Sequence, residues 1–309
     1  MAFDVSIIII NYNTTDYTIN CIESIFKHTT NEINCEYLII DNGSEAESFH
    51  SLKKYINTVS QQNAIKLIRS HINTGFGGGN MIGVNEATGK YLAFINNDVL
   101  FKNDCLRILK NFMDTNKNVG VCGPQAFKEN GDILPTIDHF ASLGRELLGR
   151  KVLEIVNSQK YPKRKKTYNQ PQKGQFVAGS FMFFNANNFN SIGGFDTNIF
   201  LYHEETDVCK RLTKLNKEAF LVPEAQFIHF HGASTPKSVA LKIELKISLL
   251  YVIRKHYGLI SFFILLLYLQ LKYFLSSLFK PKNWPVFIAL IKQVPLSISL
   301  KHKQQIHRL

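Results

Sequence analysis

The stretch VSIIII at residues 5–10 has the length and the β-branched, apolar character of a buried strand. Three similar runs follow it: YLIID at 37–41, IKLIR at 65–69 and YLAFI at 91–95. Between the first two runs lies TDYTINCIESIFKHT, whose apolar residues recur at helical spacing. This alternation predicts an α/β fold with a mainly parallel, twisted sheet flanked by helices.

Polar side chains follow three of the predicted strands, where the carboxyl ends of parallel strands collect ligands. These residues are Asn11, Asn13, Asp41, Asn96, Asn97 and Asp98. A carboxylate with oxygen-bearing neighbours at this edge suits Mg²⁺ or Mn²⁺ held jointly with a substrate diphosphate. The alternative for FINNDV at 94–99 is an aspartate that only shapes the turn after the strand.

A glycine-rich stretch, NTGFGGGNMIGVNEATGKY, occupies residues 73–91. It is not a dinucleotide fingerprint, because the sixth position counted from Gly75 is Asn80, and it is not a P-loop, because Tyr91 follows Gly-Lys. The remaining interpretation is a tight loop that opens a helix, where Gly75 and Gly77 let backbone N–H groups approach a diphosphate closely. A purely structural turn is the alternative.

Cysteine usage and the first residues bear on the compartment. The 309 residues include five cysteines, none in a CxxC pair, which favours a reducing compartment over disulfides or a zinc site. The opening MAFDVSIIIINYN has Asp4 before its apolar run and no basic leader, so it predicts a first strand and not a signal peptide. We therefore expect a cytoplasmic protein.

Positive charge is concentrated at the C-terminal end. Residues 240–309 hold eleven Lys and Arg side chains against Glu244 alone, a net charge of +10, within a chain whose net charge is +12. Apolar stretches such as YGLISFFILLLYLQL at 257–271 interrupt these cations, which favours a membrane surface over nucleic acid as the partner. We expect a globular domain at 1–237 and a basic, apolar helical extension at 238–309.

The uncharged run at 257–271 has fifteen residues, fewer than the roughly 20 that cross a bilayer. Helices that lie in the membrane interface are therefore favoured. A span interrupted by Lys272, or packing against the globular domain, are the alternatives.

The segment GGFDTNIFLYHEETDVCKRL at 193–212 places Glu204, Glu205 and Asp207 where a helix is expected to begin. Such carboxylates can serve as a general base, and the alternative is a solvated helix start. Asp207 falls in the first helical turn, where a negative charge stabilises the helix N-terminus.

Six motifs together resemble the family-2, inverting GT-A glycosyltransferases, and most closely their rhamnosyltransferase-like branch. They are SIIIINYN at the start, IIDNGS at 39–44, NTGFGGGN at 73–80, FINNDV at 94–99, GGFDTNIFLYHEETDVCKR at 193–211 and IHFHGAS at 228–234. The resemblance covers roughly residues 3–235. It implies a nucleotide-diphospho-sugar transferase fold, with the C-terminal extension as a membrane-associating addition.

The resemblance also implies a donor site. Asp41 would contact the nucleotide base or ribose, with Asn11 and Asn13 in the same pocket. Asn96 and Asp98 stand at the first and last positions of the family's metal-binding triplet, around Asn97, and many relatives have Asp where this chain has Asn96. His229 matches a histidine that completes the metal shell in some relatives, with His231 as the fallback.

On the acceptor side, the resemblance makes Glu205 the catalytic base, with Glu204 as the second choice. Glu205 stands where Asp is more usual in the family. Asp207 is expected to be mainly structural, with contact to an acceptor hydroxyl as its alternative role.

The implied activity is inverting transfer from dTDP-rhamnose or a UDP-hexose to a hydroxyl of a lipid-linked or growing surface glycan. It would take place on the inner face of the cytoplasmic membrane, with no nucleic-acid partner. The alternative is a non-catalytic, membrane-associated nucleotide-sugar-binding or scaffold protein. Because all the donor motifs lie earlier, deletion from about residue 240 is expected to leave donor binding intact.

Overall fold

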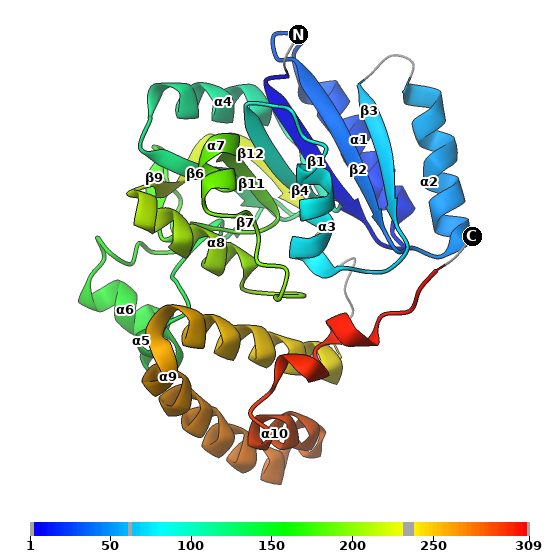
Figure 1. Cartoon of the computed structure of the whole chain (residues 1–309). Coiled ribbons are helices and arrows are strands. Elements are labelled where there is room, and N and C mark those ends of the chain that lie inside the picture. Colours follow the sequence, from blue (N-terminus) through cyan, green and yellow to red (C-terminus); the bar gives the residue numbers. More distant parts are fainter. Residues whose placement is uncertain (1–2, 61–63, 231–237, 308–309) are drawn as a thin grey trace.

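The computed structural model describes residues 3–60, 64–230 and 238–307. Its centre is a ten-stranded mixed sheet, whose first half is parallel and confirms the four predicted strands (Figure 1). These strands are β1 (Val5–Asn11), β2 (Cys35–Asn42), β3 (Ile65–Ser70) and β4 (Tyr91–Asn96). They lie in the order β3-β2-β1-β4, so the carboxyl ends of β1, β2 and β4 meet at one edge.

The second half of the sheet is mixed, with β11 antiparallel to β4 and β6, and β12 parallel to β6. Its main strands are β5 (Val99–Phe101), β6 (Val119–Phe127), β11 (Phe181–Asn185) and β12 (Glu218–His229). Two short strands complete the ten, β7 (Ile133–Leu134) beside β6 and β9 (Gln172–Gly174) beside β12. The apolar stretch GQFVAGSFMFF at 174–184 contributes to two sheets: β10 (Phe176–Val177) pairs in a small separate sheet and β11 in the main one. Residues 178–180 therefore leave the main sheet next to the site described below.

Helices cover both faces of the sheet, and each face has its own core. One face buries α1 (Thr15–His28), α2 (Ala46–Val59) and α4 (Cys105–Thr115). The other buries α3 (Gly75–Val84), α7 (Ala186–Ser191) and α8 (Glu204–Leu212). Alternate residues of β1 serve the two cores, Ile7 and Ile9 on one side and Ile8 on the other, as the period of a strand requires.

Between β6 and β10 the chain forms short elements rather than an extended loop. They are β7 (Ile133–Leu134), β8 (Ile137–Asp138), α5 (Leu143–Leu148), α6 (Arg150–Val156) and β9 (Gln172–Gly174). In the small sheet β8 pairs with β10. This pairing holds the insertion, the segment between β6 and β10, against α8.

The C-terminal extension is helical, as expected, and lies below the sheet in Figure 1. It consists of α9 (Val239–Phe279), α10 (Trp284–Ile291) and three short 3-10 turns, η2 (Pro281–Asn283), η3 (Leu296–Ile298) and η4 (Leu300–Lys303). Among the described helices, α9 is the one long and apolar enough to cross a membrane by length and composition. Gly258 breaks it, with φ 81° and ψ −178°.

The C-terminal extension has a hydrophobic core that also includes residues from the predicted globular domain at 1–237. Leu250 and Ile253 of α9 share a buried cluster with Ala141 and Ile199. The boundary at 237/238 stays a prediction, and these contacts join the two parts.

Candidate active site

A pocket of about 350 Å³ lies at the carboxyl ends of β1, β2 and β4. Three of the predicted donor-binding residues, Gly75, Asn96 and Asn97, line it. The other lining residues are Ile10, Tyr12, Thr14, Asn42, Asn73, Phe76, Asn80, Ile95, Phe200, Leu201, Leu241, Leu300 and Gln304. The pocket therefore lies where open α/β sheets bind ligands.

Asn11 and Asp41 lie next to each other, and neither is among the residues that line this pocket. Both side chains are fully buried. Asn11 Nδ2 donates to Asp41 Oδ1 at 3.1 Å, and Arg69 Nε lies 3.9 Å from Asp41 Oδ2. Asn13 has a left-handed backbone with φ 56°, and its Oδ1 accepts from Glu45 N at 2.8 Å. In this structure the three predicted residues fix the turns after β1 and β2.

The glycine-rich stretch opens helix α3, as expected. Gly75 has φ +77°, and a Cβ there would lie 2.1 Å from Phe200 O, so the position requires glycine. Its own N–H donates to Asn73 Oδ1 at 2.9 Å, and Phe76 N donates to Phe200 O at 3.0 Å. These two amides of the helix N-terminus thus bind protein acceptors, which supports a structural role for the turn.

Two asparagines hold the pocket walls in place. Asn42 Oδ1 accepts from Thr74 N at 3.0 Å, while its Nδ2 donates to Gly75 O at 3.1 Å. Asn97 Nδ2 donates to Thr14 Oγ1 at 2.7 Å and so ties the end of β4 to the start of α1. Asn42 was not among the predicted residues, although it follows Asp41 in the IIDNGS motif.

Asp98 and His229 meet beside this pocket, from the ends of β4 and β12. His229 Nε2 lies 3.2 Å from Asp98 Oδ1, and that buried oxygen accepts no hydrogen bond among the described residues. Within residues 3–60, 64–230 and 238–307, no group of three or more His, Cys, Asp and Glu side chains gathers at one point. A carboxylate and an imidazole fit a divalent ion whose remaining ligands come from a bound diphosphate. His231, the fallback ligand, lies outside the described residues.

The three acids at the start of α8 lie in different surroundings. The two residues before the helix, Tyr202 and His203, both have left-handed backbones, with φ 73° and 69°. Non-glycine residues in this region store strain and cluster at functional sites. Glu204 is buried and packs against Gly77. A Cβ added to Gly77 would lie 3.8 Å from Glu204 Cγ. Burial, together with the charge of Glu205, raises the pKa of Glu204 well above its ordinary value.

Glu205, in contrast, lines a second pocket of about 180 Å³. The other lining residues are Pro135, Thr136, Asp138, Arg145, Arg150, Phe176, Ala178, Tyr202, His203, Thr206 and Leu245. Burial raises the pKa of Glu205, and the charge of Asp138 acts in the same direction, while a backbone hydrogen bond and Arg145 oppose the shift. Burial also lowers the pKa of His203 to about 3, so this imidazole is neutral at ordinary pH.

Asp207 lies among two cations and an imidazole. Arg211 Nη2 and Lys255 Nζ each lie 2.7 Å from its carboxylate, and His256 Nε2 lies 2.8 Å from Oδ1. Burial alone would raise the pKa of Asp207, but the contacts with His256, Arg211 and Lys255 outweigh it and hold the pKa below its ordinary value. This environment favours the structural role of Asp207 over acceptor binding.

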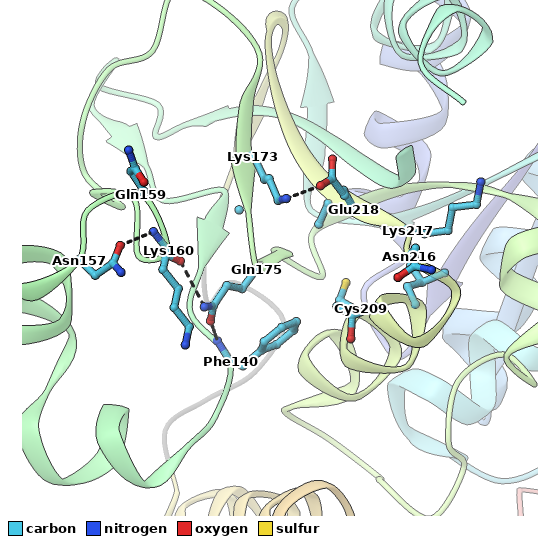
Figure 2. A pocket seen from close by; sticks show the side chains of 14 residues that line it. Phe140, Asn157, Gln159, Lys160, Lys173, Gln175, Cys209, Asn216, Lys217 and Glu218 are labelled. Atoms are coloured by element: carbon cyan, nitrogen blue, oxygen red, sulfur yellow. Dashed lines mark hydrogen bonds and ion pairs between the residues drawn. The ribbon is translucent and has the colours of Figure 1, made fainter. Parts of the chain in front are cut away.

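A larger cavity, of about 570 Å³, lies behind α8 (Figure 2). None of the predicted site residues lines it. Lys173 pairs with Glu218, and the Gln175 amide accepts from Phe140 N at 2.7 Å and donates to Lys160 O at 3.2 Å. Because these polar groups already bind one another, this cavity is a weaker candidate than the two pockets.

Comparison with known proteins identifies the family of the chain. A family model described as glycosyl transferase family 2 matches residues 6–193. Rhamnosyltransferase WbbL of Escherichia coli K12 is 27% identical over 192 residues, which cover 59% of this chain and 71% of that protein.

Two solved structures share the fold. GalNAc-T7, crystallised with UDP, GalNAc and Mn²⁺, has a TM-score of 0.61 and 15% identity, over 82% of this chain and 48% of its own. Mannosyltransferase PcManGT from Pyrobaculum calidifontis, in complex with GDP-Man and Mn²⁺, has a TM-score of 0.58 and 13% identity, over 96% and 87%. The expected GT-A fold is confirmed.

Proposed function

Because the chain belongs to glycosyl transferase family 2 and is a glycosyltransferase, we propose that it inverts the sugar configuration, with Glu205 as general base. The observation that carries this proposal is that the two pockets adjoin. Phe200 and Leu201 line the pocket at the strand ends, and the next two residues, Tyr202 and His203, line the pocket of Glu205. A donor in the first pocket and an acceptor in the second would meet at this segment.

In this mechanism the acceptor hydroxyl loses its proton to the Glu205 carboxylate as its oxygen bonds to the anomeric carbon. The bond from that carbon to the donor phosphate breaks, and the nucleoside diphosphate leaves with the electron pair. One in-line displacement inverts the configuration. A raised pKa makes Glu205 a stronger base than an exposed glutamate, and such a base contributes about 10²–10⁴-fold in rate.

Asp98 and His229 are the residues proposed to hold a divalent ion, either Mg²⁺ or Mn²⁺. An ion bound there would supply electrostatic stabilisation for the charge that develops on the departing diphosphate. The support is the buried Asp98 oxygen that accepts no hydrogen bond among the described residues, 3.2 Å from the imidazole nitrogen.

We propose that the extension lies on a membrane surface and does not cross it. The residues Ile260, Phe263, Leu267, Leu271, Phe274 and Leu278 are exposed at helical spacing along α9, and we call them the apolar face. Lys272 and Lys280 flank this face, and cations near an anionic leaflet favour binding.

The return of the chain argues against a span. After α9 the chain comes back to the first part of the protein, where His307 N donates to His71 O at 2.8 Å. The only α-helix described on that return path, α10, has eight residues and is about 12 Å long, well short of a bilayer core. We propose that the surface it binds is the inner face of the cytoplasmic membrane.

The donor is proposed to be dTDP-rhamnose or a UDP-hexose, and the acceptor a hydroxyl of a lipid-linked or growing surface glycan. A panel of nucleotide sugars, incubated with Mn²⁺ and a lipid-linked acceptor, tests this directly. Release of nucleoside diphosphate with a product of inverted anomeric configuration, read from its NMR coupling, supports the proposal. Donor binding without release would favour a non-catalytic binding protein.

A further inference from the structure

The pocket at the strand ends has one wall from the C-terminal extension. Leu241 of α9, together with Leu300 and Gln304, lines it opposite residues of the glycine-rich segment. In Figure 1 the red C-terminal segment runs from α10 back toward α2, at the edge where β1 and β2 end. The expectation that donor binding is independent of the extension therefore needs revision.

Specific contacts hold this segment, residues 296–307, which we call the strap. Glu244 of α9 is buried, and its carboxylate accepts from Ser299 Oγ at 2.8 Å and from Leu300 N at 2.8 Å. Glu244 is also the one acid among residues 240–309. A buried carboxylate costs free energy unless such bonds compensate it, so its presence here indicates a defined position for the strap.

The strap is also held further along. Lys301 Nζ donates to Thr197 O at 2.6 Å, beside the segment that leads into α8. At the end of the strap His307 N donates to His71 O at 2.8 Å, next to the loop after β3. The strap thus crosses from the Glu205 side of the site to the β3 side.

Within the strap, Gln304 is a polar residue that lines the pocket. Its Nε2 donates to Leu300 O at 2.8 Å, which fixes the side chain. This leaves the amide oxygen as an acceptor for an N–H group. No Lys, Arg, Asp or Glu is among the described residues that line the pocket, so the strap faces a region suited to an uncharged group.

We propose that the strap and the start of α9 form part of the donor site, with Leu241 and Leu300 packing on the nucleobase and the Gln304 oxygen accepting from a base N–H. This inference rests on the proposed transfer from a nucleotide donor. Gln304 is then a donor-specificity residue, and the extension has a second role besides membrane binding.

Calorimetric titration of the full-length chain with UDP, dTDP and GDP, in the presence of Mn²⁺, tests the proposal. We expect Gln304→Ala to weaken binding of the preferred nucleotide about three- to tenfold, the size of one hydrogen bond. The matched control is Gln305→Ala, because Gln305 is the exposed neighbour and does not line the pocket; its affinity should equal that of the wild type.

A chain that ends at Pro295 removes the strap and should bind the nucleotide at least about tenfold more weakly, because it loses apolar packing as well. Circular dichroism shows whether the truncated chain is folded. If it is not folded, the affinity of Gln304→Ala decides whether the proposal holds. Unchanged affinity in Gln304→Ala, or unchanged or tighter binding in a folded truncated chain, overturns the proposal. If the wild type binds none of the three nucleotides, the proposed function itself fails.

Discussion

His256 Nε2 lies 2.8 Å from Asp207 Oδ1, a contact that joins the C-terminal extension to the helix that carries Glu205. Lys255 strengthens this junction, because its Nζ lies 2.7 Å from both Asp207 Oδ1 and Asp196 Oδ2. Tyr251 OH donates to the same Asp196 oxygen at 2.7 Å. The first half of α9 is thus bound to the helix and the preceding segment that position Glu205.

The Asp207→Asn substitution should destabilise the protein by about 1.5–3 kcal/mol, because it removes the buried carboxylate that pairs with the partly exposed Arg211 and Lys255. Urea unfolding measures this change, and Asp132→Asn is the control, since Asp132 forms an exposed pair with Lys128. The folded pKa of Asp207 lies below its ordinary value of 3.8, so its contribution is present above that pH. In the wild type the contribution is lost as the pH falls through the lowered pKa. A midpoint shift no larger than that of Asp132→Asn would show that this junction contributes little.

The rate of sugar transfer should fall on the acid side of neutrality. The pKa of Glu205 is raised above its ordinary value of 4.5, so protonation removes the base at a pH where an exposed glutamate would still be charged. The pH profile of kcat, measured with saturating donor and acceptor, gives this pKa. An acidic limb at or below 4.5 would indicate that the titrating base is an exposed carboxyl.

Removal of divalent ions with EDTA should abolish transfer, and Mn²⁺ or Mg²⁺ should restore it. Asp98→Asn should raise the Mn²⁺ concentration needed for half-maximal activity, because the oxygen near His229 loses its charge. The control is Asp114→Asn, whose carboxylate binds Lys90 and Tyr91 away from the site. If Asp98→Asn and the wild type require the same Mn²⁺ concentration, the ion binds elsewhere.

Membrane binding should depend on the apolar face of α9. The double substitution of Leu267 and Leu271 by Glu should reduce co-sedimentation with anionic vesicles at least about tenfold, since each buried leucine contributes about 1.5–3 kcal/mol. Leu215→Glu is the control, because Leu215 is exposed on the other part of the protein. Equal sedimentation of all three proteins would rule out this face as the contact.

Strands β1, β2 and β4 could be predicted because each holds a run of apolar residues that are buried on both faces of the sheet. The edge strand β3 is only partly buried, and its apolar residues Ile65, Leu67 and Ile68 were enough to mark it. The full length of β12 is harder to predict, because only AFLV at 219–222 forms an unbroken apolar run, whereas the strand extends from Glu218 to His229. Pro223 and Glu224 interrupt its apolar pattern, and the sheet accommodates them by a register shift between Val222 and Gln226. A bulge of this kind leaves no periodic signal in the sequence.

The site was only partly predictable for a similar reason. Gly75, Asn96 and Asn97 follow strands or open a helix, so their position at the sheet edge follows from local pattern. Arg145 and Gln304 reach the pockets from an insertion and from the chain end, through contacts distant in sequence. No motif marks such residues in a single sequence.

The most direct test of the account compares Glu205→Gln with Glu204→Gln in transfer rate and donor affinity. Glu205→Gln should lower kcat at least about 100-fold, since the amide cannot accept the acceptor proton, while the Kd for the donor stays at the wild-type value. Glu204 lies outside both pockets, so Glu204→Gln should retain far more activity if the protein folds normally. Near wild-type transfer by Glu205→Gln, with the donor still bound, would contradict the assignment of Glu205 as the base.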